Sequence, residues 1–309
     1  MKKILVALST FGDVDESPLD ILKQSGFPFV LNPYKRRLKR DEIIQLGKDC
    51  EGIIAGVEEY DEYVLERLPK LQCISRCGVG IDNISPKKAQ ELKIVIRNTP
   101  DAPVIAVAEM TIAMILSLLH KVQLHDNWMK KKIWSKEPGF LLKDKRVGIL
   151  GLGRVGRLVA EYLMPFGAKV CGADLYPDKA WAGKMGIQLL SNRKLVVDSD
   201  ILTIHVSLIE GKELFFDRKT LLSMKRGSFL LNLSRGKLID EEALFEALKS
   251  HHLGGAALDV FSREPYDGPL CEVENVILTP HIASFTCESR TQMEVEAATN
   301  VVETLHRKQ

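Results

Sequence analysis

The sequence predicts an α/β fold with two domains, each built on a doubly wound parallel sheet. Short apolar runs alternate with helical patterns along the whole 309-residue chain, as they do where helices connect parallel strands. A glycine fingerprint stands at residues 151–156, and the roughly 140 residues before it are about the length of one domain. The chain is long enough for two hydrophobic cores, and the fingerprint belongs to the second domain.

The first half of the chain contains the strands and helices of the first expected sheet. Ser17 and Pro18 are expected to be the N-cap and the first residue of a helix that ends at Gly26. Ser85 and Pro86 are expected to begin another helix in the same way. The expected strands are residues 4–8, 27–31, 52–55, 73–75 and 94–96.

A long helix is expected over residues 103–119, between the two series of strands. It is apolar almost all round, which predicts burial between domains or subunits. Glu109 is the exception, and we interpret it as a hydrogen-bonded helix residue rather than a catalytic one. A second alternating series follows and ends in a helix over residues 286–305. Its expected strands are residues 147–150, 169–174, 201–206, 228–233, 254–259 and 276–278.

The composition argues against several classes of function. The 43 basic and 41 acidic residues leave a net charge of +2, which gives no field that would attract nucleic acid or a membrane. The apolar start is too short for a signal peptide, because Ser9, Thr10 and Asp13 interrupt it. The six cysteines show no CxxC spacing, so we expect reduced thiols in a cytoplasmic protein and no metal site.

The fingerprint Gly151-Leu152-Gly153-Arg154-Val155-Gly156 follows an apolar strand and leads into a helical pattern. In this context the first glycine turns the chain, the second lets a pyrophosphate approach the helix N-terminus, and the third packs helix against strand. The next expected strand ends in Asp174, where a carboxylate accepts hydrogen bonds from ribose hydroxyls and repels a 2′-phosphate. The sequence therefore predicts NAD rather than NADP as the cofactor.

Further expected strands end in residues that suit the oxidation of an alcohol or the reduction of a carbonyl. Hydride exchange at such a carbon needs a proton donor and acceptor, and histidine suits this role because its charge changes near neutral pH. His205 lies at the end of one expected strand, and His281 follows the end of another. Glu264 offers a carboxylate that can orient an imidazole. Arg235 offers a guanidinium that can clamp a substrate carboxylate in two parallel hydrogen bonds.

Together these motifs resemble those of the D-isomer-specific 2-hydroxyacid dehydrogenase family, and of its phosphoglycerate-dehydrogenase-like members in particular. The resemblance covers essentially the whole chain. In the first half it includes the family's substrate loop at residues 75–83 and the entry to its interdomain helix at residues 97–100 and 107–109. In the second half it is carried by Asp174 and by residues 151–156, 232–236, 259–265 and 279–284.

The resemblance implies roles for individual residues. Arg235 binds the substrate carboxylate, His281 is the acid/base that also contacts the substrate, and Glu264 is the partner of His281. The residues implied to receive the substrate in the first domain are Arg76 and the backbone amides of Gly78, Val79 and Gly80. The residues implied to surround NAD are Gly151, Gly153, Arg154, Val155, Gly156, Asp174, His205, Ser207, Leu233, Ser234, Arg235, Asp259, His281 and Ser284.

The implied fold is a Rossmann NAD domain, residues 98–285, inserted into a flavodoxin-like substrate domain, residues 1–97 and 286–309. The implied activity is a reversible, NAD-dependent hydride transfer at C2 of a D-2-hydroxy acid. The leading substrate is 3-phosphoglycerate or a similar phospho- or phosphono-hydroxy acid, because Arg76 could meet a distal phosphate. Arg76 could equally hold the loop through a salt bridge, and an unphosphorylated acid of the lactate, glycerate or glyoxylate type is then expected.

The resemblance also bears on assembly and on an alternative to catalysis. Some proteins that resemble this family act as NAD-sensing corepressors, so a scaffold of that kind is the alternative outside enzymes. The apolar helix and the resemblance to dimeric relatives predict a homodimer. Because the chain ends at Gln309, we do not expect the serine feedback that appended regulatory domains give some members. The chain departs from the family's usual residues at Cys77, His120, Ser207, Glu213 and Ser234.

Overall fold

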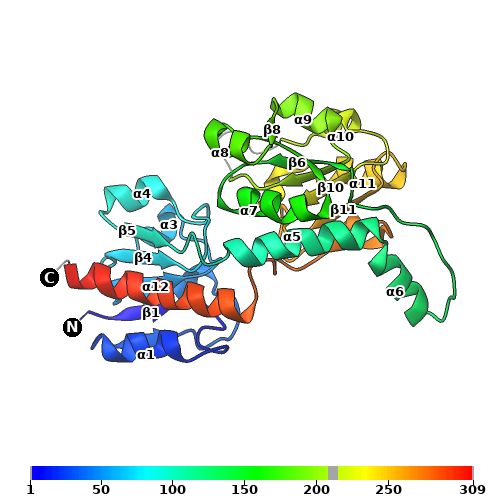
Figure 1. Cartoon of the computed structure of the whole chain (residues 1–309). Coiled ribbons are helices and arrows are strands. Elements are labelled where there is room, and N and C mark those ends of the chain that lie inside the picture. Colours follow the sequence, from blue (N-terminus) through cyan, green and yellow to red (C-terminus); the bar gives the residue numbers. More distant parts are fainter. Residues whose placement is uncertain (1, 208–214, 308–309) are drawn as a thin grey trace. The chain divides into compact units, whose positions relative to one another are not determined.

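The computed structural model describes residues 2–207 and 215–307 and divides the chain into two compact units (Figure 1). Unit 1 comprises Met1–Pro103 and Phe285–Gln309, and unit 2 comprises Val104–Ser284. The division falls after residues 103 and 284, close to the boundaries after residues 97 and 285 that the sequence suggests. Each unit has its own parallel sheet and its own hydrophobic core.

Unit 1 contains a parallel sheet of five strands: β1 (Ile4–Val6), β2 (Phe29–Leu31), β3 (Gly52–Ala55), β4 (Cys73–Arg76) and β5 (Val95–Asn98). Their order in the sheet is β2-β1-β3-β4-β5, which confirms the flavodoxin-like prediction. The helices are α1 (Ser17–Gln24), α2 (Arg40–Gly47), α3 (Glu62–Leu65), α4 (Pro86–Glu91) and α12 (Cys287–Arg307). Alternate residues of β1 face opposite sides of the sheet, because side chains in a strand have a period of two. Ile4 and Val6 pack in the core with α1 and α12, whereas Leu5 packs in the core with α2 to α4.

The first helix corrects one detail of the sequence analysis. The N-cap of α1 is Glu16, whose side chain makes no capping hydrogen bond, and Ser17 is already helical. The Asp15 carboxylate accepts the Ser17 N–H at 2.8 Å, so an acidic residue before the serine supplies the acceptor. The prediction of Ser17 as N-cap is therefore wrong by one residue. Gly26 follows the helix with φ +71, as expected for the residue that ends it.

Unit 2 contains a parallel sheet of seven strands: β6 (Arg146–Leu150), β7 (Lys169–Ala173), β8 (Gln188–Leu189), β9 (Ile201–Ile204), β10 (Phe229–Asn232), β11 (Gly255–Leu258) and β12 (Val276–Leu278). Their order is β12-β11-β10-β9-β6-β7-β8, so the direction of winding reverses between β6 and β9. This doubly wound arrangement confirms the predicted Rossmann domain. The short strand β8 was not expected from the sequence.

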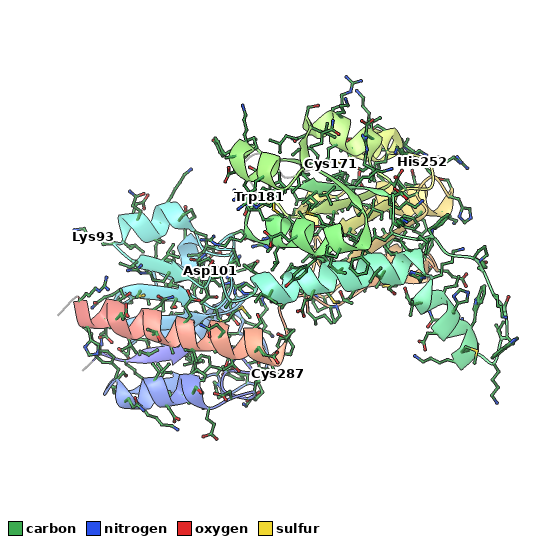
Figure 2. All side chains as sticks on the ribbon, in the orientation of Figure 1. Lys93, Asp101, Cys171, Trp181, His252 and Cys287 are labelled. Carbon is green, nitrogen blue, oxygen red and sulfur yellow. The ribbon has the colours of Figure 1, made fainter. Side chains whose placement is uncertain are left out.

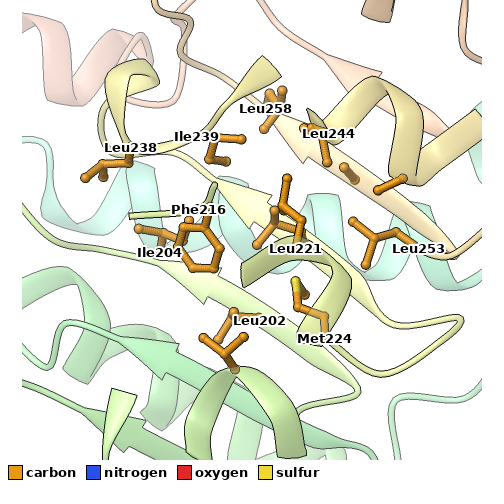
Figure 3. Close-up of a cluster of buried hydrophobic side chains, with 14 of the residues drawn as sticks. Leu202, Ile204, Phe216, Leu221, Met224, Leu238, Ile239, Leu244, Leu253 and Leu258 are labelled. Atoms are coloured by element: carbon orange, nitrogen blue, oxygen red, sulfur yellow. The ribbon is translucent and has the colours of Figure 1, made fainter. Parts of the chain in front are cut away.

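Helices cover both faces of the unit 2 sheet. They are α5 (Val104–Leu119), α6 (Val122–Lys130), α7 (Arg154–Leu163), α8 (Lys179–Lys184), α9 (Asn192–Asp198), α10 (Arg218–Ser223) and α11 (Glu241–Lys249). Figure 3 shows the core on one face, where Leu202 and Ile204 of β9 meet Leu221 of α10 and Leu244 of α11. The neighbouring residue Ile201 packs on the opposite face with α5 and α7. Successive residues of a strand thus pack on opposite faces, so helices anchor the sheet from both sides. Because the strands are parallel, their carboxyl ends lie together at one edge of the sheet.

The long helix α5 buries only one side within the chain. Ala108, Ile115 and Leu119 belong to the core of unit 2, whereas Ile105 is 59% exposed and Glu109 is exposed as well. The predicted burial of its remaining surface between domains or subunits stays a prediction. In the part of the chain that the structure describes, no single helix is long and apolar enough to cross a membrane; α5 and α6 pass such a test only as a pair bent by 66°.

All six cysteines are free thiols in the structure. Four are buried, among them Cys171 in β7, whereas Cys271 and Cys287 are exposed (Figure 2). Within the described ranges 2–207 and 215–307, no group of three or more His, Cys, Asp or Glu side chains is arranged to hold a metal ion.

Candidate active site

The turn between β6 and α7 depends on three glycines with different roles. Gly151 has φ +96, and a side chain there would collide with the backbone of His205, which follows β9. A side chain at Gly156 would collide with the carbonyl oxygen of Gly151, so this glycine lets α7 pack on the turn. Around a Cβ placed on Gly153, the N-cap of α7, no described heavy atom lies within 4 Å. The turn therefore has open space at the helix N-terminus.

This space suits the pyrophosphate of a dinucleotide. No side chain caps the start of α7, so the amides of its first turn can donate to an anion, which the helix dipole also favours. The turn follows β6, next to the position where the strand order reverses, and nucleotides bind at such switch points. Arg154 and Val155, which the sequence assigns to the cofactor, are the first residues of this helix.

Asp174 follows β7 directly, and two backbone amides hold its carboxylate. Oδ2 accepts the Leu152 N–H at 2.7 Å, and Oδ1 accepts the Tyr176 N–H at 2.8 Å. Leu152 belongs to the glycine turn, so its hydrogen bond fixes the Asp174 carboxylate next to the fingerprint. A carboxylate at this position can accept hydrogen bonds from ribose hydroxyls and disfavours a 2′-phosphate.

Arg157 supports the same turn from outside the fingerprint. Its Nε donates to the Leu152 carbonyl at 3.0 Å, and its Nη1 pairs with Asp178 at 3.1 Å. Its guanidinium also lies over the Trp181 ring, with Cζ 4.8 Å from the ring centroid. Asp178 in turn caps α8. An arginine immediately after the fingerprint, followed by an Asp N-cap, is the signal that could have found this brace.

His205 shapes the glycine turn through its backbone. Its N–H donates to the Leu150 carbonyl at 2.7 Å, and its own carbonyl lies against Gly151. Its ring is hydrogen-bonded back to β9, with Nε2 2.9 Å from Thr203 Oγ1. A contact between this ring and NAD stays a prediction. Ser207 is exposed, and the departure at Glu213 lies outside the described residues.

The environment of His205 predicts a pH dependence of stability. Burial lowers the pKa of its imidazole to about 4, whereas in the unfolded chain the value is about 6.5. Between these values the unfolded state binds a proton that the folded state does not, so stability falls as the pH drops from about 6.5 to about 4. This group alone should lower the unfolding free energy at pH 5 by about 2 kcal/mol relative to pH 7.5. Urea unfolding at both pH values measures the difference.

A histidine variant isolates this contribution. His205→Gln should remove most of the loss between pH 7.5 and pH 5, whereas His120→Gln, at an exposed position, should leave it unchanged. An equal pH dependence in wild type and in the His205 variant would contradict the assignment.

Arg235 follows β10 in a turn that a buried asparagine holds together. The side chain of Asn232, which is fully buried, accepts the Ser234 N–H at 3.0 Å and the Ser234 hydroxyl at 2.9 Å. It also donates to the Arg235 carbonyl at 2.9 Å. Arg235 Nη1 donates to the Ser234 carbonyl at 2.7 Å, and Leu233 packs in the core. A polar residue at the end of a buried strand is the signal that identifies Asn232 as the support of this turn.

Glu264 and His281 form a hydrogen-bonded pair. His281 Nδ1 lies 2.9 Å from Glu264 Oε2, and Glu264 Oε1 accepts the Phe261 N–H at 3.1 Å. Because Nδ1 is engaged, Nε2 is the nitrogen of His281 that can exchange a proton with a substrate. A side chain at Gly236, next to Arg235, would collide with the Phe261 backbone, so the arginine turn touches the loop of Glu264. The structure thus brings the three predicted catalytic residues to the ends of neighbouring strands β10, β11 and β12.

Asp259 fastens the loop that carries His281. It is completely buried, and its carboxylate accepts the Thr279 hydroxyl at 2.6 Å and the Ile282 and Ala283 N–H groups at 2.8 Å each. These donors lie on both sides of His281 in the sequence. The contacts described for Asp259 are therefore with the protein, and its contact with NAD, like that of Ser284, stays a prediction.

In unit 1, the predicted substrate loop follows β4. Gly78 has φ +135, and its N–H donates to the Thr99 hydroxyl at 2.7 Å. The assignment of this amide to a substrate carboxylate therefore needs correction, because Thr99 already accepts its hydrogen bond. Val79 is 44% exposed, and the Asn98 side chain holds its carbonyl at 2.7 Å. The amides of Val79 and Gly80 stay the predicted anion donors of the loop.

The chain is similar to known proteins, and a family model matches most of unit 2. Residues 112–283 match the NAD binding domain of the D-isomer specific 2-hydroxyacid dehydrogenases. The chain is 35% identical over 295 residues to D-3-phosphoglycerate dehydrogenase of Methanocaldococcus jannaschii, a match that covers 94% of this chain and 55% of that one. It is 33% identical over 269 residues to glyoxylate reductase of Korarchaeum cryptofilum, covering 84% of this chain and 81% of that one.

A solved structure also superposes on the whole chain. NAD-dependent formate dehydrogenase of Staphylococcus aureus in complex with NAD superposes with a TM-score of 0.87 at 26% identity, covering 100% of this chain and 96% of that one. The chain spans about half the length of the phosphoglycerate dehydrogenases that it matches. For the enzyme of Methanocaldococcus jannaschii the share is 55%.

Proposed function

Because the chain belongs to the D-isomer-specific 2-hydroxyacid dehydrogenase family, we propose that it transfers a hydride between NAD and C2 of a D-2-hydroxy acid or its 2-keto acid. The observation that carries this proposal is the pair of His281 and Glu264, joined at 2.9 Å at the same sheet edge as Arg235. An imidazole backed by a carboxylate can exchange the hydroxyl proton, and a guanidinium can hold the acid group.

Each of the three side chains has a distinct task in the proposed reaction. NAD, when bound, would supply the hydride acceptor for oxidation and the hydride donor for reduction. His281 takes the hydroxyl proton on Nε2 during oxidation and gives it back to the carbonyl oxygen during reduction. Glu264 accepts the hydrogen bond from Nδ1 and stabilises the imidazolium that forms. Arg235 orients the substrate by pairing with its carboxylate, and the amides of Val79 and Gly80 are proposed as further donors to it.

Two features of unit 2 support NAD as the cofactor. The family domain that residues 112–283 match is an NAD binding domain. Asp174 also carries a negative charge at the end of β7, anchored to the glycine turn through Leu152 at 2.7 Å. A 2′-phosphate at that position would meet this charge, so NADP should bind more weakly than NAD.

The substrate class depends on unit 1. The relatives include D-3-phosphoglycerate dehydrogenases and a glyoxylate reductase, so phosphorylated and unphosphorylated acids are both represented. A phosphorylated acid such as 3-phosphoglycerate needs a cation for its distal phosphate. Arg76, at the end of β4, is the residue that the sequence proposes for this contact.

NADH oxidation with a panel of 2-keto acids, each with and without a terminal phosphate, tests the proposed function. At least one member should be reduced, and NADPH should support a much lower rate. If no acid is reduced although NADH binds, the proposal fails and the NAD-sensing scaffold is favoured.

We also propose that the chain forms a homodimer in the cytoplasm. The segment from α6 to residue 141 exposes apolar side chains, with Trp134 81% and Leu141 68% exposed, and contiguous exposed apolar residues mark interaction surfaces. A second copy of the chain is the proposed partner. Light scattering at micromolar concentration should give the mass of two chains, and Trp134→Asp should shift it towards one. A stable wild-type monomer would contradict this assembly.

A further inference from the structure

A buried carboxylate lies at the edge of the unit 1 sheet where substrate is proposed to bind. Glu58 follows β3 and is only 3% exposed, although its neighbours Val57 and Glu59 are exposed. Its Oε2 accepts the Gly56 N–H at 2.8 Å. A buried carboxylate is costly unless hydrogen bonds and a cation compensate for its lost hydration. No motif or spacing in the sequence marks this residue.

Arg76 lies on the neighbouring strand, near enough for its charge to act on Glu58. It ends β4, the strand next to β3 in the sheet, so both residues lie at the same edge. Burial raises the pKa of Glu58; hydrogen bonds from the backbone of Glu58 itself and from Gly56 oppose the rise, as do the charges of Arg76 and of the exposed Arg37. Tyr60 belongs to the same cluster. Burial and the charge of Glu58 raise the pKa of its hydroxyl, and the charge of Arg76 opposes this rise.

The guanidinium of Arg76 is also part of the substrate loop. It donates to the carbonyl of Cys77, and a side chain on Gly78 would collide with it. The Arg76 guanidinium therefore packs against the backbone of residues 77 and 78, at the start of the loop that continues into Val79 and Gly80. A cation in this position can either meet a substrate phosphate or balance the nearby carboxylate of Glu58.

The segment that carries Glu58 is fastened to the same loop. The Asn83 side chain donates to the carbonyls of Gly56 at 3.1 Å and Glu58 at 2.6 Å. The Tyr60 N–H donates to the Asn83 carbonyl at 2.8 Å. These bonds fix the backbone on both sides of Glu58 against the loop, and the Gly56 N–H holds the carboxylate itself at 2.8 Å.

We propose that Glu58 determines specificity: it uses the positive charge of Arg76, so the enzyme accepts 2-keto acids with an uncharged side group and rejects phosphorylated ones. This inference rests on the proposed function and deepens it. A phosphate brought to Arg76 would face the carboxylate of Glu58, and like charges in a poorly hydrated site repel strongly. An uncharged hydroxymethyl, methyl or hydrogen substituent meets no such repulsion.

Hydroxypyruvate and 3-phosphohydroxypyruvate test the proposal, because they differ only in the phosphate. The wild-type enzyme should reduce hydroxypyruvate with a kcat/KM at least about tenfold higher than that for the phosphorylated acid. Glu58→Gln should shift this ratio by about tenfold or more towards the phosphorylated acid, since it removes the repelling charge and keeps the side chain's size. The KM for NADH should stay unchanged, because the nucleotide residues lie in unit 2.

Two further variants make the result specific. Glu59→Gln is the matched control, since Glu59 is adjacent, exposed and paired with Arg40 at 2.8 Å, and its ratio should equal that of wild type. Arg76→Met should lower kcat/KM for both acids by the same factor, because Arg76 supports the loop and does not bind phosphate.

Three outcomes would overturn the inference: a wild-type preference for the phosphorylated acid, an unchanged ratio in Glu58→Gln, or a selective loss of the phosphorylated acid in Arg76→Met. The wild-type ratio and the Arg76 variant decide the matter even if Glu58→Gln does not fold. Failure of the proposed function would look different, because wild type would then reduce neither acid.

Discussion

Replacing His281 by asparagine should lower kcat for the reduction of a 2-keto acid by ~10²–10⁴-fold, the loss expected when a positioned acid/base is removed. Asparagine is the suitable replacement because His281 has φ +56, a left-handed conformation that asparagine tolerates well. Its amide keeps a polar side chain in place but cannot exchange a proton with the substrate. Steady-state oxidation of NADH measures the loss.

Cofactor binding separates this chemical effect from a folding defect. The proposed pyrophosphate and ribose positions are at Gly153 and Asp174, on other strand ends, so the Kd for NADH should change little in His281→Asn. Glu264→Gln should give a smaller fall in kcat, because the amide still fills the space but no longer stabilises the imidazolium by its charge. If His281→Asn kept kcat within about tenfold of wild type, less than the contribution of an acid/base, His281 would not be that group.

The sheets could be predicted because the sequence repeats a regular alternation of apolar runs and helical segments. Six of the seven strands in unit 2 coincide with such runs. The seventh, β8, is the dipeptide Gln188–Leu189, which is too short to carry a periodic signal. The helix α6 begins after Lys121 and has no buried residue, so packing against a hydrophobic core does not define it.

The positions of the site residues could be predicted more readily than their hydrogen bonds. Parallel strands end at one edge of a sheet, so Arg235, Glu264 and His281 were expected there from their places after strands. The donor–acceptor pairs depend on residues that are distant in sequence. Thr99 accepts the Gly78 N–H from 21 residues away, and no local pattern indicates that this amide is already used. The burial of Glu58 beside Arg76 likewise depends on two neighbouring strands and not on spacing.

Replacing Asp259 by alanine should destabilise unit 2 by about 1–3 kcal/mol, since its carboxylate accepts from three donors and the buried one, the Ala283 N–H, costs about that much without a partner. The three donors are the Thr279 hydroxyl and the N–H groups of Ile282 and Ala283, at 2.6 to 2.8 Å. The loop they hold carries His281, and a displacement of about 1 Å at a catalytic group can cost about 10²-fold in rate. Calorimetry and NADH oxidation should therefore show a loss of stability and of kcat together.

The pattern of the two losses tells how Asp259 acts. Asp259→Asn keeps the volume and one acceptor but turns an NH₂ group towards a backbone N–H, so both losses should be intermediate. Asp267→Ala, at an exposed position after Glu264, should leave both properties at the wild-type level. Lost stability with normal kcat below the unfolding temperature would mean that Asp259 does not position His281. Normal stability with lost kcat would instead mean that the carboxylate acts on the cofactor directly, which is the role that the family resemblance implies.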